Sequence, residues 1–260
     1  WDAIWNFCAN RFLKTMEDWK QRTNILIGDD GIEKLAKAHV LVVGLGGVGA
    51  YAAEQLARAG IGEMTIVDSD TVSVTNKNRQ LLALDSTIGR LKTDVMAERI
   101  RDINPDIKLH VLPQYLKDQS IIDLMAQKFD FVVDAIDTMA PKVFLLYYAV
   151  QNHQNIVSCM GAGGKFDPTK IEICDMSKSY NCRLAFYIRK RLHRLGIREG
   201  ITVVFSPEKV ADDAFIVEDE QQQNKIATVG TISYMPAVFG CFCASHVINQ
   251  LLGTQNRVSF

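Results

Sequence analysis

The segment from His39 to Arg79 constrains the fold more than any other part of the chain. It begins with the β-branched run His39–Val43 and continues into the glycine cluster Gly44-Leu45-Gly46-Gly47-Val48-Gly49 and an alanine-rich segment. A second apolar run, Met64–Val67, then leads to Asp68. This order of patterns predicts a strand, a tight turn, a helix and a second strand. The segment is therefore predicted to form half of a nucleotide-binding fold.

The glycines of this cluster have different mechanical roles. Gly44 permits the sharp turn that follows the strand, and Gly49 lets the next helix pack closely on the sheet. Gly46 or Gly47 lets backbone N–H groups approach a phosphate, which would lie at the N-terminus of that helix. Asp68, about twenty residues beyond the glycines, can accept hydrogen bonds from ribose hydroxyls. Together these features predict nucleotide binding.

The residues that follow Asp68 favour a triphosphate over a dinucleotide. An NAD enzyme also ends its second strand with an acid, so Asp68 alone does not exclude a dehydrogenase. The chain then adds further candidate contacts to the nucleotide, namely Asp70, Asn76, Asn78, Arg79, Gln80 and, at the start of the next predicted helix, Lys92. A forked donor such as Arg79 and a mobile point charge such as Lys92 suit the phosphates of a triphosphate. A dinucleotide would not use both.

Several short motifs resemble the ubiquitin-activating-enzyme superfamily of ATP-dependent adenylating enzymes. They are Val43-Gly44-x-Gly46-Gly47-x-Gly49, Asp68-x-Asp70-x-Val72, Asn78-Arg79-Gln80, Gly89-x-x-Lys92, Ile103-Asn104-Pro105 and Asp134-Ala-Ile-Asp137. The resemblance covers about residues 20 to 252. Within the superfamily the chain is most similar to the tRNA threonylcarbamoyladenosine dehydratases, through Ala59-Gly60-Ile61-Gly62, Asp137-x-x-x-Pro141-Lys142, Gly161-Ala162-Gly163-Gly164 and Asp167-Pro168-Thr169-Lys170-Ile171.

This resemblance implies ATP and Mg²⁺ as ligands and a homodimer as the assembly. It gives catalytic roles to Arg79, Lys92 and Asp137, with Asp137 also holding the magnesium ion that bridges the phosphates. In related enzymes an arginine of the N-terminal segment reaches the phosphates bound by the partner subunit, and Arg22 is the nearest match. The alternative for Arg22 is a solvated surface arginine. The alternative for Asp137 is an N-cap of the helix predicted from Met139.

Beyond the nucleotide-binding unit, predicted strands alternate with predicted helices. The strands cover 107–112, 129–134, 155–159, 170–174 and 202–205, and the helices cover 29–38, 91–100, 120–127 and 139–152. Asp29 or Asp30 is the expected N-cap of the first helix. The alternation predicts an α/β, Rossmann-like fold with a mainly parallel sheet, helices on both faces and a strand-rich C-terminal part. Since ligands gather at the carboxyl ends of parallel strands, Asp68, Asp70 and Asp137 are expected on one rim.

The length of the chain fits one large domain or one domain with an appendage. With 260 residues and 48% hydrophobic content, the chain can bury a substantial core. We assign residues 16–252 to a single ATP-binding adenylating domain, leave residues 1–15 unassigned, and treat residues 253–260 as a C-terminal tail. The first residues show no signal-peptide pattern, and the six cysteines include no Cys-x-x-Cys pair. We therefore expect a cytoplasmic, reduced protein without structural zinc.

The formal net charge of −1 indicates no global basic field, so contact with RNA requires a local patch. The most basic stretch, Cys182–Arg194, predicts an amphipathic helix. Its apolar face would consist of Leu184, Ile188, Leu192 and Leu195, while Arg183, Lys190, Arg191 and Arg194 would project elsewhere. Its basic side could hold the phosphates of a tRNA or could be a solvated cationic surface. The apolar run Ile232–Leu252 is long enough to span a membrane, but its internal polar residues favour a packed helix. We expect no membrane contact.

Three functional hypotheses of different class remain. The first is a tRNA-modifying enzyme that adenylates the carboxylate of threonylcarbamoyladenosine with ATP and closes a ring with loss of water. The second is an enzyme that adenylates the C-terminus of a ubiquitin-like sulfur carrier, and the third is a non-catalytic nucleotide-binding member. The missing Cys-x-x-Cys pairs argue against the second, and the presence of Arg79, Lys92 and Asp137 argues against the third. The polar segment 212–225, predicted to be a mobile loop, contains no cysteine, and the resemblance also allows a sulfur-relay protein as a partner.

Overall fold

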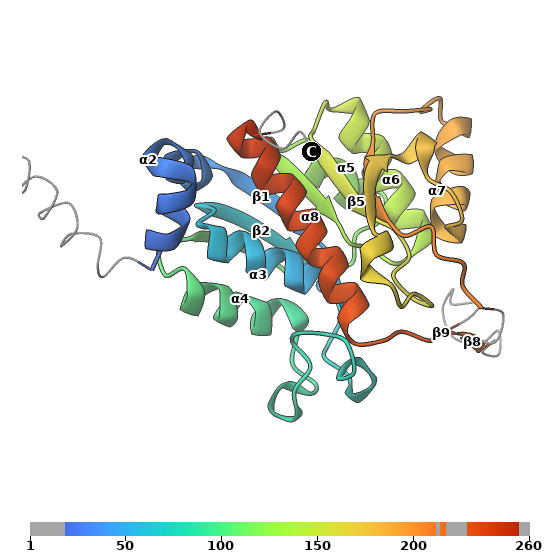
Figure 1. Cartoon of the computed structure of the whole chain (residues 1–260), viewed down its shortest axis with the longest axis horizontal. Coiled ribbons are helices and arrows are strands. Elements are labelled where there is room, and N and C mark those ends of the chain that lie inside the picture. Colours follow the sequence, from blue (N-terminus) through green and yellow to red (C-terminus); the bar gives the residue numbers. More distant parts are fainter. Residues whose placement is uncertain (1–18, 212–213, 217–227, 255–260) are drawn as a thin grey trace, which may run out of the picture.

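A computed structural model describes residues 19–211, 214–216 and 228–254 (Figure 1). The unassigned segment 1–15, most of the predicted loop 212–225 and most of the tail 253–260 lie outside these residues. Within them the chain forms a seven-stranded sheet with helices on both faces. This architecture confirms the predicted Rossmann-like α/β class.

The main sheet has the strand order β3-β2-β1-β4-β5-β7-β6. Its strands are β1 (His39–Val43), β2 (Glu63–Val67), β3 (Lys108–Leu112), β4 (Phe131–Asp134), β5 (Ile156–Cys159), β6 (Glu172–Asp175) and β7 (Thr202–Phe205). Neighbouring strands run parallel, except that β6 pairs antiparallel with β7 at the edge. A separate two-stranded sheet joins β8 (Phe215–Ile216) to β9 (Thr228–Val229). The predicted mainly parallel sheet is therefore confirmed, and β6 to β9 form the strand-containing later part.

The central strand β1 is buried on both faces because its apolar residues alternate between two cores. Val40 and Val42 pack with α3 (Gly49–Ala59), α4 (Lys92–Ile103) and α8 (Tyr234–Leu252). Leu41 and Val43 pack with α5 (Gln119–Met125), α6 (Met139–Gln151) and α7 (Arg183–Arg194) on the opposite face. A continuous Val and Leu run is the pattern expected of a parallel strand covered on both sides. The short 3₁₀ helices are η1 (Val74–Asn76), η2 (Asp85–Thr87), η3 (Pro168–Lys170) and η4 (Met176–Lys178).

The first described helix is longer than the sequence pattern indicates. Helix α2 covers Gln21–Lys37 and is interrupted at Gly28, whose backbone angles are φ 75° and ψ 173°. The predicted helix from Asp29 or Asp30 therefore corresponds to its second half. Asn24 Nδ2 donates to Asp29 Oδ1 across the break at 2.8 Å. The first half escaped prediction because a glycine with positive φ divides its apolar pattern.

The apolar C-terminal helix α8 packs as a core helix, as predicted. Figure 1 shows it lying across the same face of the sheet as α3. A Cβ atom added at Gly240 would lie 2.5 Å from the carbonyl oxygen of Val48, so this glycine lets α8 approach α3 closely. Among the described helices, α8 is the one with the length and hydropathy that could cross a membrane. Its buried side, which includes Phe239 and Val247, belongs to the core under the sheet.

The second glycine cluster forms a turn, as predicted, rather than a helix start. Gly164 has φ 68° and donates its backbone N–H to the carbonyl oxygen of Gly230 at 2.7 Å. A Cβ atom added at Gly163 would lie 3.0 Å from Val229 Cγ1. These glycines therefore allow the turn to approach the segment that contains β9 closely.

Candidate active site

The glycine loop joins the carboxyl end of β1 to the start of α3, beside the point between β1 and β4 where the strand order reverses. Gly44 has φ 88°, and its N–H donates to the carbonyl oxygen of Val67 at 2.8 Å. A Cβ atom added at Gly49 would lie 1.8 Å from the carbonyl oxygen of Gly44. The loop is closed on itself so tightly that no side chain fits at Gly49, which agrees with the packing role predicted for it.

The structure separates the roles of Gly46 and Gly47, which the sequence left open. A Cβ atom added at Gly47 would lie 2.9 Å from Pro236 Cβ of α8, so this glycine makes room for a helix. At Gly46 the nearest atom to such a Cβ is Gln80 Nε2 at 3.9 Å. Gly46 therefore borders open space next to an amide donor. Of the two glycines, Gly46 is the one that leaves room for a phosphate.

Asp68 ties the glycine loop to the end of β2. Its Oδ2 accepts a hydrogen bond from the backbone N–H of Leu45 at 2.6 Å, and its Oδ1 accepts one from Asp70 at 2.7 Å. Burial raises the pKa of Asp68, while the nearby ammonium of Lys92 and the two N–H donors lower it. Each carboxylate oxygen keeps a second lone pair, so a ribose hydroxyl can still donate to Asp68.

Lys92 is the buried cation of the site. It begins α4, is 5% exposed, and places its Nζ 2.7 Å from Asp70 Oδ2. The Asp70 side chain is far more open to solvent, at 66% exposed. The position of Lys92 at the N-terminus of α4 adds the partial positive charge of the helix to that of the ammonium. The start of α4 therefore combines a buried ammonium with the positive end of a helix dipole, and Asp70 is the partner of that ammonium in this structure.

The Asn-Arg-Gln segment lies next to the glycine loop, with Gln80 near Gly46 and Arg79 near Gly47, and has a defined local structure. Arg79 Nη1 donates to the carbonyl oxygen of Thr75 at 3.1 Å and to Asn78 Oδ1 at 2.8 Å. The Asn76 side chain accepts the backbone N–H of Ser73 at 3.1 Å, which closes the turn of η1. Asn78 Nδ2 donates to the carbonyl oxygen of Thr231 at 3.0 Å. The two asparagines hold the segment in place, and the remaining guanidinium N–H groups are available to a ligand.

Asp137 lies beyond the carboxyl end of β4, where the sequence predicted it, and its side chain is exposed. Its neighbour Asp134 is completely buried and accepts Ser158 Oγ at 2.6 Å and Lys142 Nζ at 2.8 Å. Lys142 Nζ also donates to the carbonyl oxygen of Ile136 at 3.0 Å. The structural role predicted for Asp134 agrees with these contacts. Lys142 therefore connects the buried Asp134 carboxylate to the loop that carries Asp137.

Arg22 is not brought together with the other predicted site residues within one chain. It is exposed on the first turn of α2, two residues after Lys20, whose side chain lies next to Gly60. Gly60 follows the last residue of α3, while the glycine loop precedes the first. Eleven residues of helix, about 16 Å, separate these two ends. Within a single chain Arg22 therefore lies toward the amino edge of the sheet.

Sequence reasoning did not identify several residues that shape the site. Pro236 and Thr231 come from the far end of the chain, and no local pattern connects them to the glycine loop. Lys142 was quoted only as part of a motif, although a lysine inside the apolar helix α6 is a signal for a buried partner. Its partner Asp134 ends the fully buried strand β4, and a carboxylate in such a strand likewise indicates a buried partner of opposite charge.

The fold and the site together define an α/β protein of the nucleotide-binding, adenylating class, with phosphate-binding groups at the carboxyl edge of a parallel sheet. Comparison with known proteins gives the particular family. The chain belongs to the ThiF family, which matches residues 20–259.

Full-length relatives support this assignment. The tRNA threonylcarbamoyladenosine dehydratase of Escherichia coli is 36% identical over 258 residues, which cover 92% of this chain and 96% of that protein. The enzyme of the same name from Bacillus subtilis is 37% identical, with 89% and 93% covered. The crystal structure of the E. coli dehydratase in complex with ATP superposes with a TM-score of 0.83 and covers 94% of this chain and 98% of that one. The E. coli molybdopterin-synthase adenylyltransferase is 40% identical over 111 residues, 43% of this chain and 44% of that enzyme.

Proposed function

We propose that this protein is an ATP-dependent enzyme that adenylates the carboxylate of threonylcarbamoyladenosine in tRNA and then cyclises it with loss of water. The observation that carries the proposal is the buried Lys92 ammonium held by Asp70, whose backbone N–H and that of Leu45 in the glycine loop both donate to Asp68. A positive charge at that place suits the triphosphate of ATP. The dehydratases that match this chain do so over nearly its whole length, which supports the tRNA substrate.

The reaction has two steps, and neither needs a protein nucleophile. A carboxylate oxygen of the threonylcarbamoyl group attacks the α-phosphorus of ATP, which forms an acyl adenylate and releases pyrophosphate. A nitrogen or oxygen of the same modification then attacks the activated carbonyl carbon, loses its proton and expels AMP, so the nucleoside loses one water. Lys92 and Arg79 stabilise charge on the phosphates. Positioning and electrostatic stabilisation of this kind account for much of the catalysis in such transfers.

Magnesium belongs to the proposal as the ion that accompanies ATP. The exposed carboxylate of Asp137 at the carboxyl end of β4 is an oxygen donor of the kind that Mg²⁺ prefers together with substrate phosphates. Bound there, the ion would neutralise charge on the phosphates. Asp134 is a poor alternative ligand because Lys142 and Ser158 already occupy its carboxylate.

The basic helix α7 is the proposed contact for the tRNA backbone. Ile188 and Leu192 are buried against the sheet, while Lys190, Arg191 and Arg194 are exposed on the other side. Leu195, expected on the apolar face, is 41% exposed at the end of the helix. Arg189 has a different role, because its Nη1 donates to the carbonyl oxygens of Met176 and Ser179. Exposed charges on one helix face can hold phosphates without reading sequence.

The assembly and location form the last part of the proposal. A homodimer would allow Arg22, which lies far from the glycine loop of its own chain, to reach the phosphates in the partner subunit. A partial match to the sulfur carrier protein ThiS adenylyltransferase of E. coli, 37% identical over 146 residues, supports a sulfur-relay protein as a further partner. We place the enzyme in the cytoplasm, where tRNA and ATP are available.

A water-loss assay tests the proposed function. The purified protein is incubated with ATP, Mg²⁺ and total tRNA that contains threonylcarbamoyladenosine, and the nucleosides are analysed by mass spectrometry. We expect one water to be lost from the modified nucleoside, together with stoichiometric AMP and pyrophosphate. tRNA without the modification is the control and should give neither product. Adenylation of a Gly-Gly-ended carrier protein without loss of water would contradict the proposal and favour a sulfur-carrier enzyme.

A further inference from the structure

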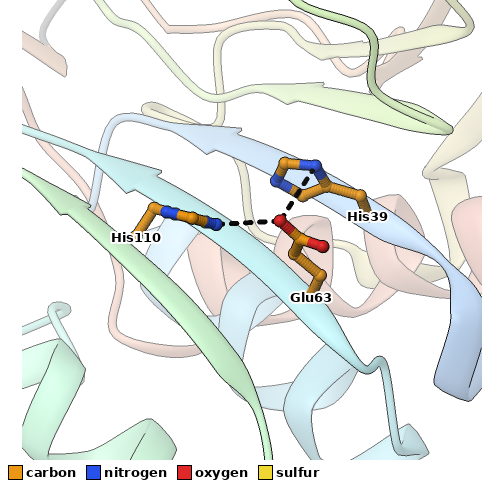
Figure 2. A group of neighbouring side chains, drawn as sticks. All are labelled: His39, Glu63 and His110. Carbon is orange, nitrogen blue, oxygen red and sulfur yellow. Dashed lines mark hydrogen bonds and ion pairs between the residues drawn. The ribbon is translucent and has the colours of Figure 1, made fainter.

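A second polar cluster lies at the amino edge of the sheet, at the opposite end of the strands from the glycine loop. It consists of His39, Glu63 and His110, which come from β1, β2 and β3 (Figure 2). His39 pairs in register with Glu63, and Thr65 pairs with His110. Because side chains two residues apart share a face, all three side chains project to the same side of the sheet. Parallel pairing therefore gathers residues that are 24 and 47 positions apart in the sequence.

The distances in this cluster suit a small coordination site. His110 Nε2 lies 2.8 Å from Glu63 Oε1, and His39 Nδ1 lies 3.6 Å from the same oxygen. One nitrogen or oxygen atom from each residue lies within 4.8 Å of the others. Ligand atoms about 2.0 to 2.2 Å from a common ion are about 3.3 to 3.6 Å apart in tetrahedral geometry, so small side-chain movements would bring the three atoms onto one ion. The three side chains are only partly exposed, at 20%, 27% and 42% for His39, Glu63 and His110.

The ring of His39 is fixed in an orientation that presents Nδ1 to the cluster. Its Nε2 lies 2.9 Å from the hydroxyl of Thr65, which is buried, and Phe129 packs edge-on against the ring at 4.8 Å between centroids. When Nε2 donates its proton to Thr65, Nδ1 presents a lone pair to the Glu63 carboxylate. Two acceptors then face each other at 3.6 Å, a geometry that a cation between them satisfies. A hydrogen bond from the second ring nitrogen is the usual support of a metal-binding histidine.

The protonation states of His39 and Glu63 also suit a cation between them. Burial lowers the pKa of His39, although the Glu63 carboxylate opposes the effect, and a neutral imidazole is the form that binds metal. The hydrogen bond from Lys108 lowers the pKa of Glu63, which keeps that ligand ionised. Lys108 Nζ lies 2.8 Å from Glu63 Oε1, but its side chain is 67% exposed. It can therefore turn into solvent when another cation takes its place.

We propose that His39, Glu63 and His110 form a binding site for a divalent transition-metal ion of the Zn²⁺ type. Two imidazole nitrogens and one carboxylate oxygen are a ligand set that such ions accept, with a fourth position open to water. The set differs from the all-oxygen ligands that Mg²⁺ prefers, so the site is distinct from the one proposed for ATP. The length of β1, five residues or about 17 Å, separates the two places. A bound ion would join the first strands of the sheet and stabilise the folded chain by mass action.

Metal titration of the full chain tests this proposal. Co²⁺ is added to the metal-free protein, and the absorption of the bound ion is followed, with Zn²⁺ used in competition. We expect one saturable site, without a thiolate-to-cobalt charge-transfer band, and a melting temperature that rises with metal concentration. The absence of saturable binding, or a spectrum dominated by thiolate ligands, would overturn the proposal.

Variants locate the site. Glu63→Gln and His110→Gln should each weaken metal binding at least tenfold, and His193→Gln, which changes an exposed histidine elsewhere, should leave it unchanged. Thr65→Val keeps the shape of the buried side chain but removes the partner of His39 Nε2, and we expect about 10- to 100-fold weaker binding. Lys108→Met removes the competing ammonium and should bind the ion at least as tightly as the wild type.

Circular dichroism checks the folding of every variant. If a ligand variant fails to fold, Thr65→Val and Lys108→Met still decide the question, because neither removes a proposed ligand. Wild-type affinity in Thr65→Val, or loss of binding in His193→Gln, would show that the metal binds elsewhere and would overturn the assignment.

Discussion

Lys92 and Asp70 are joined twice at the edge of the candidate active site. Lys92 Nζ lies 2.7 Å from Asp70 Oδ2, and the backbone N–H of Lys92 donates to the carbonyl oxygen of Asp70 at 2.9 Å. The backbone bond fixes where α4 begins, and the side-chain pair fixes where the ammonium points. Since the carboxylate is largely solvated and the ammonium is buried, a phosphate can replace Asp70 as the partner without leaving a charge buried alone.

Replacement of the Lys92 ammonium should remove most of the activity and little of the stability. Lys92→Met keeps the packing of the buried stem but removes the positive charge, while the exposed Asp70 carboxylate remains solvated. We expect pyrophosphate release to slow by about 100-fold or more, as when one preorganised donor to a developing charge is lost. Lys77→Ala, which removes the exposed pair with Asp85, is the matched control and should retain full activity. Wild-type rates in Lys92→Met would contradict the role given to this lysine.

Alanine substitutions should distinguish Gly46, where we expect an effect on ATP binding, from Gly47 and Gly49, where we expect an effect on stability. Gly46→Ala places a methyl group in open space, so we expect a melting temperature near that of the wild type and ATP binding weakened by tenfold or more. Calorimetric titration with ATP measures the affinity.

The neighbouring glycines should give the reverse result. Gly47→Ala would bring Cβ to 2.9 Å from Pro236 Cβ, and Gly49→Ala would bring it to 1.8 Å from the carbonyl oxygen of Gly44. Both variants should lower the melting temperature, and Gly49→Ala should do so more strongly. Equal stability of the three variants would show that the loop is not packed as described.

The buried pair of Lys142 and Asp134 should be costly to break on one side. Both side chains are completely buried, so Lys142→Met leaves a carboxylate without its counter-charge. We expect the free energy of unfolding to fall by about 3 to 5 kcal/mol. The double variant Lys142→Met with Asp134→Asn removes both charges and should recover a large part of that loss. Urea denaturation of the single and double variants measures the difference, and strict additivity would argue against a direct interaction.

The ion pair between Glu54 of α3 and Arg99 of α4 should contribute to stability in a pH-dependent way. Burial alone would raise the pKa of Glu54, but hydrogen bonds from Arg99 and Arg58 outweigh it and hold the pKa below the ordinary value of 4.5. A carboxyl with a lowered pKa in the folded state stabilises the protein above its unfolded pKa, and this stabilisation is lost as the pH falls through the folded pKa.

Glu54→Gln should therefore destabilise the protein at neutral pH and have a smaller effect at an acidic pH below the folded pKa of Glu54, where the wild-type carboxyl is protonated. Unfolding in urea at the two pH values gives both free energies. Glu98→Gln, which removes an exposed pair with Arg90, serves as the control and should change stability little at either pH. A constant cost of Glu54→Gln across this range would exclude the proposed linkage.

Local patterns were sufficient to predict most of the fold. The apolar runs of β1 and β4, the glycine cluster and the regular alternation of strands with helices each depend on neighbouring residues, and the structure confirms them. The first half of α2 was missed because Gly28 interrupts the helical pattern, so the predicted helix began only at Asp29 or Asp30. Where a positive φ interrupts a helix, periodicity alone does not show that the chain resumes it.

The candidate site was predictable only in part, since several of its contacts join distant segments. The choice between Gly46 and Gly47 depends on Pro236, which lies almost two hundred residues further along the chain. The cluster of His39, Glu63 and His110 depends on the pairing register of three strands, and no spacing in the sequence reveals it. A charged residue within a buried element, such as Lys142, indicates a buried partner of opposite charge, but the motif that contains Lys142 was not used to predict one.

The packing of α8 against the glycine loop has a consequence for synthesis on the ribosome. Pro236 and Gly240, which close over the loop and over α3, are translated almost two hundred residues after it. A nascent chain can form β1 and α3 early, but the wall beside Gly47 is missing until α8 has left the exit tunnel. The nucleotide pocket is therefore finished only after α8 has been synthesised.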